Sequence, residues 1–161
     1  MKKAAVATSV EVVESAADFE RFRDLVTEYE DSLPEDLRHV HSQREVGDLE
    51  KYYGPPGAAF VASVDGRAAG CVALTIVDGS TAVIKKLYVK PAFRNLGLAR
   101  QLLTSLTDFA RGRGISRLVL DTERERLPAA YKLYVSLGFR ECEPYARVGY
   151  ACPTFMERKL A

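Results

Sequence analysis

The chain has 161 residues, of which 47% are hydrophobic and 28% are charged, and its 23 Lys and Arg residues nearly balance its 22 Asp and Glu residues. This composition is typical of a folded globular protein and excludes a disordered or fibrous chain. The length predicts one domain, residues 1–161, that buries a full hydrophobic core. Because the formal net charge is only +1, we expect no broad basic surface and no nucleic-acid partner.

The cysteines and the N-terminus bear on metal binding and location. Cys71, Cys142 and Cys152 have no C-x-x-C spacing, so the sequence predicts neither a zinc site nor a disulfide framework, and we expect no metal. The basic residues Lys2 and Lys3 are followed by alternating apolar and polar residues, not by the continuous apolar run of a signal peptide. Since no stretch is long and apolar enough to cross a membrane, we expect a cytoplasmic protein with no membrane partner.

The first third of the chain predicts a strand and two helices. Alternation predicts a strand over Val6 to Val13, and Ser15 then caps a helix whose apolar residues recur at helical spacing. A capping box, Ser42-x-x-Glu45, predicts a second, short helix that continues through Val46, Leu49 and Tyr52. Eleven acidic residues against four Lys or Arg lie between positions 18 and 50. They either attract a cationic substrate or form a solvated helix face.

The middle of the chain predicts an antiparallel meander. Two apolar strands, Ala58 to Val64 and Ala68 to Val77, are joined by Asp65-Gly66, a strong signal for a tight hairpin. A third strand then covers Thr81 to Val89. These three strands form the predicted centre of a sheet.

The last part of the chain alternates helices and strands. The sequence predicts a helix from Leu98 to Arg111, a strand from Arg117 to Asp121 and a helix from about Pro128 to Leu137. Further strands are expected near Phe139 to Tyr145 and over Pro153 to Leu160. Because a strand, a helix and a strand follow one another around residues 81–121, we expect one parallel crossover there and antiparallel pairing elsewhere.

The turn between the third strand of the meander and the next helix predicts an anion site. Arg94-x-x-Gly97-x-Ala99 places unpaired N–H groups at a helix start, where a phosphate binds favourably. Gly97 and Ala99 are small enough to let a diphosphate approach the backbone. Nearby cations greatly outnumber the one acid, Asp108; they are Lys85, Lys86, Lys90, Arg94, Arg100, Arg111, Arg113 and Arg117.

The same turn carries a family resemblance. The order Gln or Arg, two residues, Gly, one residue, Gly or Ala resembles the acetyl-CoA signature of the GNAT acyltransferase superfamily, and Arg94, Gly97 and Ala99 satisfy it. A later segment, in which Leu133-Tyr134 precedes Gly138-Phe139, is similar to a second motif of that family. The resemblance covers roughly Val61 to the C-terminus.

The resemblance implies an α+β (mixed α/β) fold. We expect a central, twisted, mostly antiparallel sheet of about seven strands, with one splayed parallel pair and about four flanking helices. Acetyl-CoA is the implied co-substrate, its pantetheine arm lying between the splayed strands, and a bulge near Leu87 to Val89 is the expected cause of the splay. The residues implied to bind it are Leu87, Tyr88, Val89, Arg94, Asn95, Leu96, Gly97, Leu98, Ala99 and Arg100.

The implied chemistry is direct attack of an amine on the thioester. By the resemblance Tyr134 is the general acid, with the Val89 amide polarising the carbonyl. The base is not evident, since Val83 stands where related proteins often carry Glu. Glu123 is a weaker candidate, and the pair His39 and His41 belongs to a segment that often borders the acceptor pocket.

Two functions remain open at this point. The first is an N-acetyltransferase that acts on a primary amine of a small molecule or of a protein. The second is a regulatory protein that binds CoA or acyl-CoA with little transferase activity. Exposed sheet edges also make a homodimer an expectation. Three features cannot be read from the sequence: the acceptor, the base and the acyl-chain preference.

Overall fold

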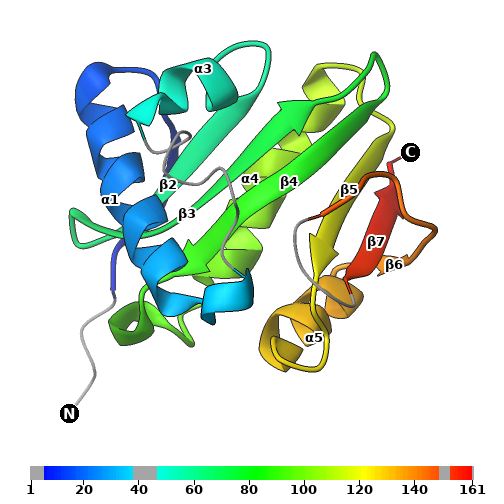
Figure 1. Ribbon diagram of the computed structural model, residues 1–161. Coiled ribbons are helices and arrows are strands. Elements are labelled where there is room, and N and C mark those ends of the chain that lie inside the picture. The colour runs from blue at the N-terminus through cyan, green and yellow to red at the C-terminus, as the bar shows by residue number, and fades with distance from the viewer. Residues whose placement is uncertain (1–5, 38–46, 149–152, 161) are drawn as a thin grey trace.

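The computed structural model describes residues 6–37, 47–148 and 153–160. Within them a seven-stranded sheet has the order β1-β2-β3-β4-β5-β7-β6 (Figure 1). The strands are β1 Thr8–Val12, β2 Ala58–Val64, β3 Arg67–Ile76, β4 Thr81–Val89, β5 Arg117–Thr122, β6 Arg140–Glu141 and β7 Thr154–Lys159. The α-helices are α1 Ala16–Ser32, α3 Leu49–Tyr53, α4 Leu98–Gly112 and α5 Pro128–Ser136, with 3-10 turns η1 Glu35–Leu37 and η2 Pro91–Phe93. The mixed sheet with one parallel pair and flanking helices is the expected architecture, which is confirmed.

The start of α1 is held by the predicted cap. Ser15 Oγ accepts a hydrogen bond from the Asp18 N–H at 3.1 Å, and Asp18 Oδ2 accepts one from the Ser15 N–H at 3.1 Å. This reciprocal pair satisfies two N–H groups that the helix itself leaves open. The second capping box, Ser42 with Glu45, lies outside the described residues, and the short helix that follows is α3.

The predicted hairpin turn connects β2 to β3 in the meander. Asp65 and Gly66 have φ values of 48° and 80°, the left-handed pair that a tight two-residue turn between twisted strands requires. β1, β2, β3 and β4 then pair antiparallel in sequence order. This half of the sheet follows the sequence pattern closely.

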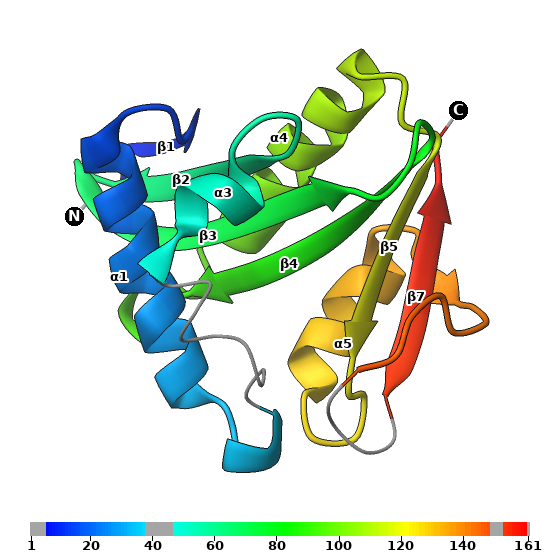
Figure 2. The same cartoon turned by 45° about the horizontal axis from the view of Figure 1, so that its top comes forward.

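Strand β4 has a different partner on each edge, β3 in antiparallel pairing and β5 in parallel pairing. It pairs with β5 in parallel, but only over Thr81 to Val83 opposite Arg117 to Val119. Beyond Val83 the two strands diverge (Figure 2), which confirms the predicted parallel crossover and splay. The bulge lies at Lys86 and Leu87, at the start of the predicted range near Leu87 to Val89. Lys86 has a φ of 60°, and the register with β3 shifts opposite Val72.

The bulge also exchanges the faces of β4. Before it, Ala82 and Ile84 pack into the core beneath α4, whereas after it Lys86 and Tyr88 face α1. Strand side chains alternate, so without the extra residue Lys86 would have entered the α4 core. The insertion therefore moves a cation from one face of the sheet to the other.

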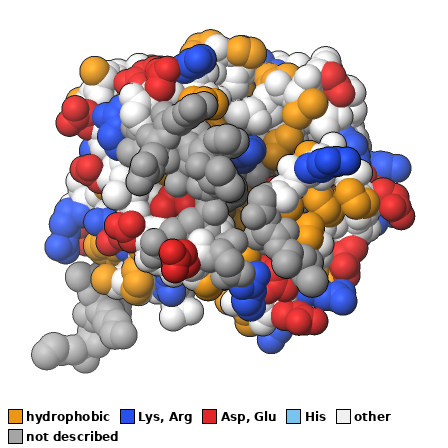
Figure 3. All heavy atoms as spheres, in the orientation of Figure 1, with side chains coloured by type: hydrophobic (Ala, Val, Ile, Leu, Met, Phe, Trp, Pro, Cys, Tyr) orange, Lys and Arg blue, Asp and Glu red, His pale blue; other side chains and the backbone are white. Residues whose placement is uncertain are grey.

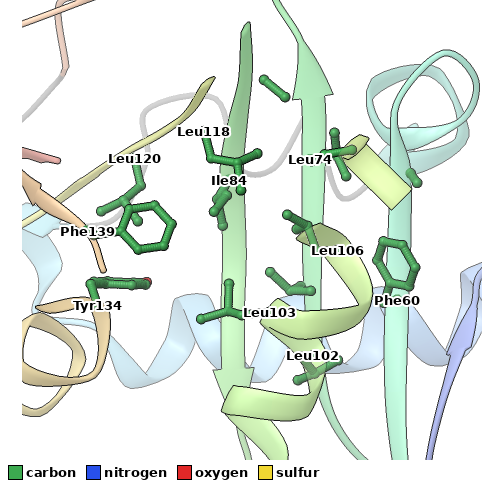
Figure 4. Close-up of a cluster of buried hydrophobic side chains, with 14 of the residues drawn as sticks. Phe60, Leu74, Ile84, Leu102, Leu103, Leu106, Leu118, Leu120, Tyr134 and Phe139 are labelled. Atoms are coloured by element: carbon green, nitrogen blue, oxygen red, sulfur yellow. The ribbon is translucent and has the colours of Figure 1, made fainter. Parts of the chain in front are cut away.

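Two apolar layers hold the sheet. The helices α1 and α3 cover one face, where Phe22, Leu25, Leu49 and Tyr53 are buried. The other face packs against α4 and α5, and Figure 4 shows part of this layer. Its members include Phe60, Leu74, Ile84, Leu102, Leu103, Leu106, Leu118, Leu120, Tyr134 and Phe139.

One predicted strand is much shorter than expected. The pattern from Phe139 to Tyr145 predicted a full strand, but only Arg140–Glu141 pairs with β7. Pro144 has no N–H to donate to a ladder, and Tyr145 turns its ring onto Phe155, with ring centroids 5.1 Å apart. The segment therefore leaves the sheet after Cys142, whose N–H still donates to the Phe155 carbonyl of β7 at 2.9 Å.

Candidate functional site

A cavity of about 830 Å³ begins where β4 and β5 separate. Its walls come from five stretches of the chain: the end of α1 with η1, the end of β4, η2 with the turn and first helical residues of α4, the end of β5 with the loop after it, and the first turns of α5. The splay is therefore the mouth of a pocket rather than a packing defect. A pocket of this size suits a small molecule.

The first turn of α4 supplies backbone donors to one end of the cavity. Asn95 and Gly97 have φ values of 66° and 78°, and the first helical hydrogen bond runs from the Gln101 N–H to the Gly97 carbonyl at 3.1 Å. The N–H groups of residues 98–100 precede this bond and have no acceptor within the helix. Predicted residues Asn95, Gly97, Leu98, Ala99 and Arg100 line the cavity here.

Leu96 is the exception among the predicted residues of this turn. Its side chain is 39% exposed and does not line the cavity. Arg94 lines it, and the Arg94 Nε donates a hydrogen bond to the Val89 carbonyl at 3.1 Å. Arg100 also lines it and donates to Ser136 Oγ at 3.2 Å, which ties α4 to α5. Two guanidinium groups thus stand beside the backbone donors.

The end of β4, which leads through η2 into this turn, also forms part of the wall. Leu87, Tyr88 and Val89 all line the cavity, as predicted. The Lys90 N–H donates to the Ala69 carbonyl of β3 at 2.8 Å. Because successive N–H groups of a strand alternate between its two edges, the Val89 N–H is directed toward the open edge that faces β5.

Tyr134 lies in the second turn of α5 and also lines the cavity. It is 8% exposed, and its ring meets Phe139 edge-on with centroids 5.8 Å apart (Figure 4). Burial raises the pKa of its hydroxyl well above the ordinary value, and the negative charge of Asp121 raises that pKa further. The phenol therefore keeps its proton at neutral pH.

The weaker base candidate, Glu123, already has partners of its own. Its carboxylate accepts hydrogen bonds from the N–H groups of Glu125 and Arg126 and from Arg126 Nε, at 3.1, 2.7 and 3.0 Å. Desolvation opposes ionisation, but these hydrogen bonds outweigh it and hold the pKa below its usual range. Glu123 therefore organises the β5–α5 loop, which makes it a poor proton acceptor.

The other sequence candidates for the base contribute no acceptor either. Val83 is a buried apolar residue of β4. The pair His39 and His41 lies outside the described residues.

Several lining residues were not anticipated as site residues, and two of them, Tyr29 and Asp121, carry polar side chains next to the splay. Tyr29 was interpreted only as part of an apolar helix face, yet it lines the cavity and packs against Tyr88 with ring centroids 5.7 Å apart. Asp121 lines the cavity from the end of β5, and its Oδ1 accepts a hydrogen bond from the Tyr145 hydroxyl at 3.2 Å. The sequence did contain a signal for Asp121, because this acid is the last residue of an otherwise apolar predicted strand that follows the parallel crossover.

The remaining surface gives few further indications. On the face in Figure 3, described acidic and basic side chains are interspersed without a broad patch of one sign. Among the described residues no group of three or more His, Cys, Asp or Glu is arranged to hold a metal ion. None of the described helices has the length and apolarity needed to cross a membrane. The predicted location and the predicted homodimer stay predictions.

Comparison with known proteins identifies the family. The model of the Acetyltransferase (GNAT) family matches residues 20–139. An uncharacterized N-acetyltransferase of Schizosaccharomyces pombe is 35% identical over 140 residues, which is 85% of this chain and 85% of that protein. Human N-acetylaspartate synthetase is 38% identical over 99 residues, but these cover 60% of this chain and only 32% of that protein.

A solved structure agrees on the fold. YncA of Salmonella typhimurium, whose structure was solved with its cofactor acetyl-CoA, has a TM-score of 0.71 at 23% identity over 96% of this chain and 95% of that one. The family model spans the cavity's β4, α4, β5 and α5 walls. The chain therefore belongs to the GNAT family of acetyltransferases.

Proposed function

We propose that this protein transfers the acetyl group of acetyl-CoA to a primary amine of a small molecule or a protein, by direct attack while both substrates are bound. The observation that carries the proposal is the loss of β4–β5 pairing after Val83, which opens into one cavity with a helix N-terminus at one end and Tyr134 in its wall. Such a gap accepts an extended chain between two strands. The cavity has room for an amine on the opposite side.

The α4 turn and the β4 edge are the proposed binding surface for acetyl-CoA. The N–H groups of residues 98–100 and the charges of Arg94 and Arg100 would hold the pyrophosphate, while Gly97 and Ala99 leave space for it. The open edge of residues 87–89 would pair with the amide groups of the pantetheine arm. Acetyl-CoA in the similarly folded YncA supports this choice of co-substrate.

Two groups of the chain are proposed to act on the bound thioester, which supplies the activated acetyl group. The Val89 N–H would polarise the carbonyl oxygen. The Tyr134 hydroxyl would donate a hydrogen bond and then a proton to the departing sulfur. An ordinary phenol is a weaker acid than a thiol, about 10 against about 8.5 in pKa. Tyr134 is therefore most effective as a hydrogen-bond donor close to the sulfur.

The acceptor side of the cavity favours a compact amine. Tyr29, Ser32 and Leu33 at the end of α1, with Leu37 of η1, line the same cavity as Asp121 and form an amphipathic wall. A carboxylate in that position attracts an ammonium group. The name of the human relative, N-acetylaspartate synthetase, makes amino acids the first small molecules to test.

The test is a measurement of thiol release from acetyl-CoA across amino acids, polyamines and peptides with free N-termini or lysines. We expect at least one amine to accelerate release and to gain an acetyl group by mass spectrometry. Tight CoA binding without release for any acceptor would instead favour the regulatory alternative. Absence of CoA binding would remove both functions.

The role of Tyr134 has a matched test on the same helix. We expect Tyr134→Phe to lower kcat by about 10²-fold or more, the usual effect of losing an acid catalyst, while CoA affinity stays within twofold. Tyr131→Phe is the control, because the Tyr131 hydroxyl donates to Glu141 at 3.0 Å and does not line the cavity. A Tyr134→Phe protein that loses affinity but keeps kcat would reassign Tyr134 to binding.

A further inference from the structure

A second, smaller cavity lies inside the splay itself. Its volume is about 40 Å³, and it is bounded by β4, β5, α1 and α5. It shares four wall residues with the large cavity, so the two adjoin. The shared residues are Tyr29, Leu87, Asp121 and Tyr134, and the others are Ile84, Lys85, Lys86 and Leu120.

The size and polarity of this cavity suit ordered water. A buried water needs roughly 10–15 Å³ and two to four polar partners. The small cavity exceeds that volume, and the residues that line it include Tyr29, Tyr134, Asp121 and Lys85, all of which have polar side-chain groups. An apolar cavity of the same size would stay dry, whereas this one offers both donors and acceptors.

Asp121 is oriented toward the acceptor side of the sheet. Leu118 and Leu120 pack into the core beneath α4 and α5. Because strand side chains alternate, the Asp121 side chain points to the opposite face, which α1 covers. Tyr29 of α1 lines both cavities together with Asp121. The carboxylate thus stands between the small cavity and the proposed amine site.

We propose that Asp121 is the general base of this enzyme, and that it takes the proton of the acceptor ammonium through a water held in the small cavity. This inference rests on the acetyl transfer proposed above. It assigns the function that the buried apolar Val83 cannot perform and that Glu123, held by its own loop, performs poorly.

Several charged and titratable groups surround the small cavity. Lys86 is paired with Glu30 at 2.8 Å, so the buried ammonium already has a counter-ion. Burial raises the pKa values of the Tyr29, Tyr134 and Tyr145 hydroxyls, and the negative charge of Asp121 raises each of them further. The titratable groups that face this region are Tyr29 and Glu30 of α1, Lys85 and Lys86 of β4, Tyr134 of α5 and Tyr145.

The proton movements balance. The ammonium gives one proton through the water to Asp121, and the neutral amine forms the new C–N bond as the C–S bond breaks. The sulfur leaves with the phenolic proton of Tyr134, and the phenolate recovers a proton from the newly acylated nitrogen. Asp121 then releases its proton to solvent, so the net products are an amide, a free thiol and one proton.

The test compares the pH profiles of wild type and Asp121→Asn with one amine acceptor. Asn keeps an oxygen that accepts the Tyr145 hydrogen bond, so the fold is preserved. We expect kcat at pH 7 to fall by about 100-fold or more, the usual contribution of a general base. The deficit should shrink as the pH approaches the acceptor's own pKa, about 10 for an alkyl amine, because the free amine then needs no base.

Controls separate the possible failures. Asp108→Asn makes the same substitution at an exposed position of α4, 71% exposed at the side chain, and should leave the profile unchanged. Activity of Asp121→Asn equal to wild type, or a deficit constant at every pH, overturns the assignment while acetyl transfer stands. A wild-type protein that acetylates no amine overturns the proposed function instead.

A second variant guards against local misfolding. Asp121→Ala leaves space beside the small cavity, and added formate, a small carboxylate, should restore part of its kcat at pH 7. Formate should have no effect on wild type or on Asp108→Asn. An Asp121→Ala protein that is folded by circular dichroism, slow, and indifferent to formate would also contradict the proposal.

Discussion

The two edges of β4 behave differently, although they belong to the same nine residues. On one edge, pairing with β3 runs from Ala82 to Val89. On the other, pairing with β5 ends at Val83. The closed edge lies within the continuous sheet, and the open edge carries the cavity. One strand therefore supplies both the rigid support and the site that this support positions.

The bulge at Lys86 lies just beyond Val83, the last residue of β4 that pairs with β5. Before it, Ala82 and Ile84 make apolar contacts with the α4 core. After it, Lys86 reaches across to Glu30 of α1, where the two side chains are only 1% and 8% exposed. Beyond the end of the β4–β5 ladder, the ion pair between Lys86 and Glu30 therefore connects β4 to α1. The substitutions below test either the contacts that support β4 or the open edge that lines the cavity.

Lys86→Met should have the largest effect on stability. It leaves the Glu30 carboxylate buried without its ammonium, and removing one partner of a buried ion pair costs about 3–5 kcal/mol. We expect that loss in the free energy of unfolding measured with urea. The double variant Lys86→Met with Glu30→Met should recover most of it.

An exposed ion pair provides the comparison for Lys86. Arg111→Met removes a pair with Asp108 whose nitrogen and oxygen are 3.8 Å apart and whose side chains are 45% and 71% exposed. Exposed pairs contribute little, about 0.5 kcal/mol or less. A Lys86→Met protein as stable as Arg111→Met would show that the contact with α1 does not support the open edge.

Ala99→Glu should act on the open edge alone. The new side chain adds bulk and negative charge where residue 99 lines the cavity, so CoA affinity measured by calorimetry should fall by at least about 100-fold, or about 2.7 kcal/mol. An acid in the first turn of a helix is favourable for the fold, so the melting temperature should not drop. Thr104→Glu, on the exposed side of α4, should change neither quantity.

Gly70→Ala should act on the closed edge and reach the open one. A Cβ at Gly70 would lie 2.7 Å from the Tyr88 carbonyl oxygen and 3.2 Å from Val89 Cγ2. Such overpacking costs about 1–3 kcal/mol, and we expect the displaced end of β4 to raise the KM for acetyl-CoA. Gly79→Ala, where a Cβ meets nothing within 4 Å, should match wild type in both measurements.

Controls apart, Ser15→Ala should give the smallest loss of stability among the destabilised variants, and it serves as a reference for the larger losses. Loss of an N-cap side chain costs about 1 kcal/mol, and the capped end of α1 is remote from the Tyr29 to Ser32 end that lines the cavity. Stability should fall while CoA affinity is unchanged. Ser15→Asp, which keeps a capping oxygen, should restore the loss, and a change in affinity would show that α1 transmits strain to the site.

Much of the fold was predictable because local chemistry and global packing agree. Ser15 and Asp18 form a helix cap that requires no tertiary contact. The dipeptide Asp65-Gly66 strongly favours a tight hairpin turn over other local structures. The apolar spacing of α4 and the signature at Arg94, Gly97 and Ala99 located the helix start that lines the cavity. These features depend on residues close together in the chain.

The rest depends on contacts between distant segments. The position of the bulge follows from Lys86 finding Glu30, which is 56 residues earlier. The inclusion of Tyr29 and Asp121 in the site depends on how α1 and β5 meet across the sheet. The short β6 follows from Tyr145 packing on Phe155. The spacing of residues within one segment does not predict such long-range contacts.

The shortness of the β4–β5 ladder has a mechanical consequence. The parallel ladder that joins the two halves of the sheet, β1–β4 and β5–β7–β6, consists of three residue pairs. Arg100 of α4, hydrogen-bonded to Ser136 of α5, adds a second fastening on the helix side. A ligand that lay along the gap would contact both halves of the sheet. Its binding would therefore restrict the motion of one half relative to the other.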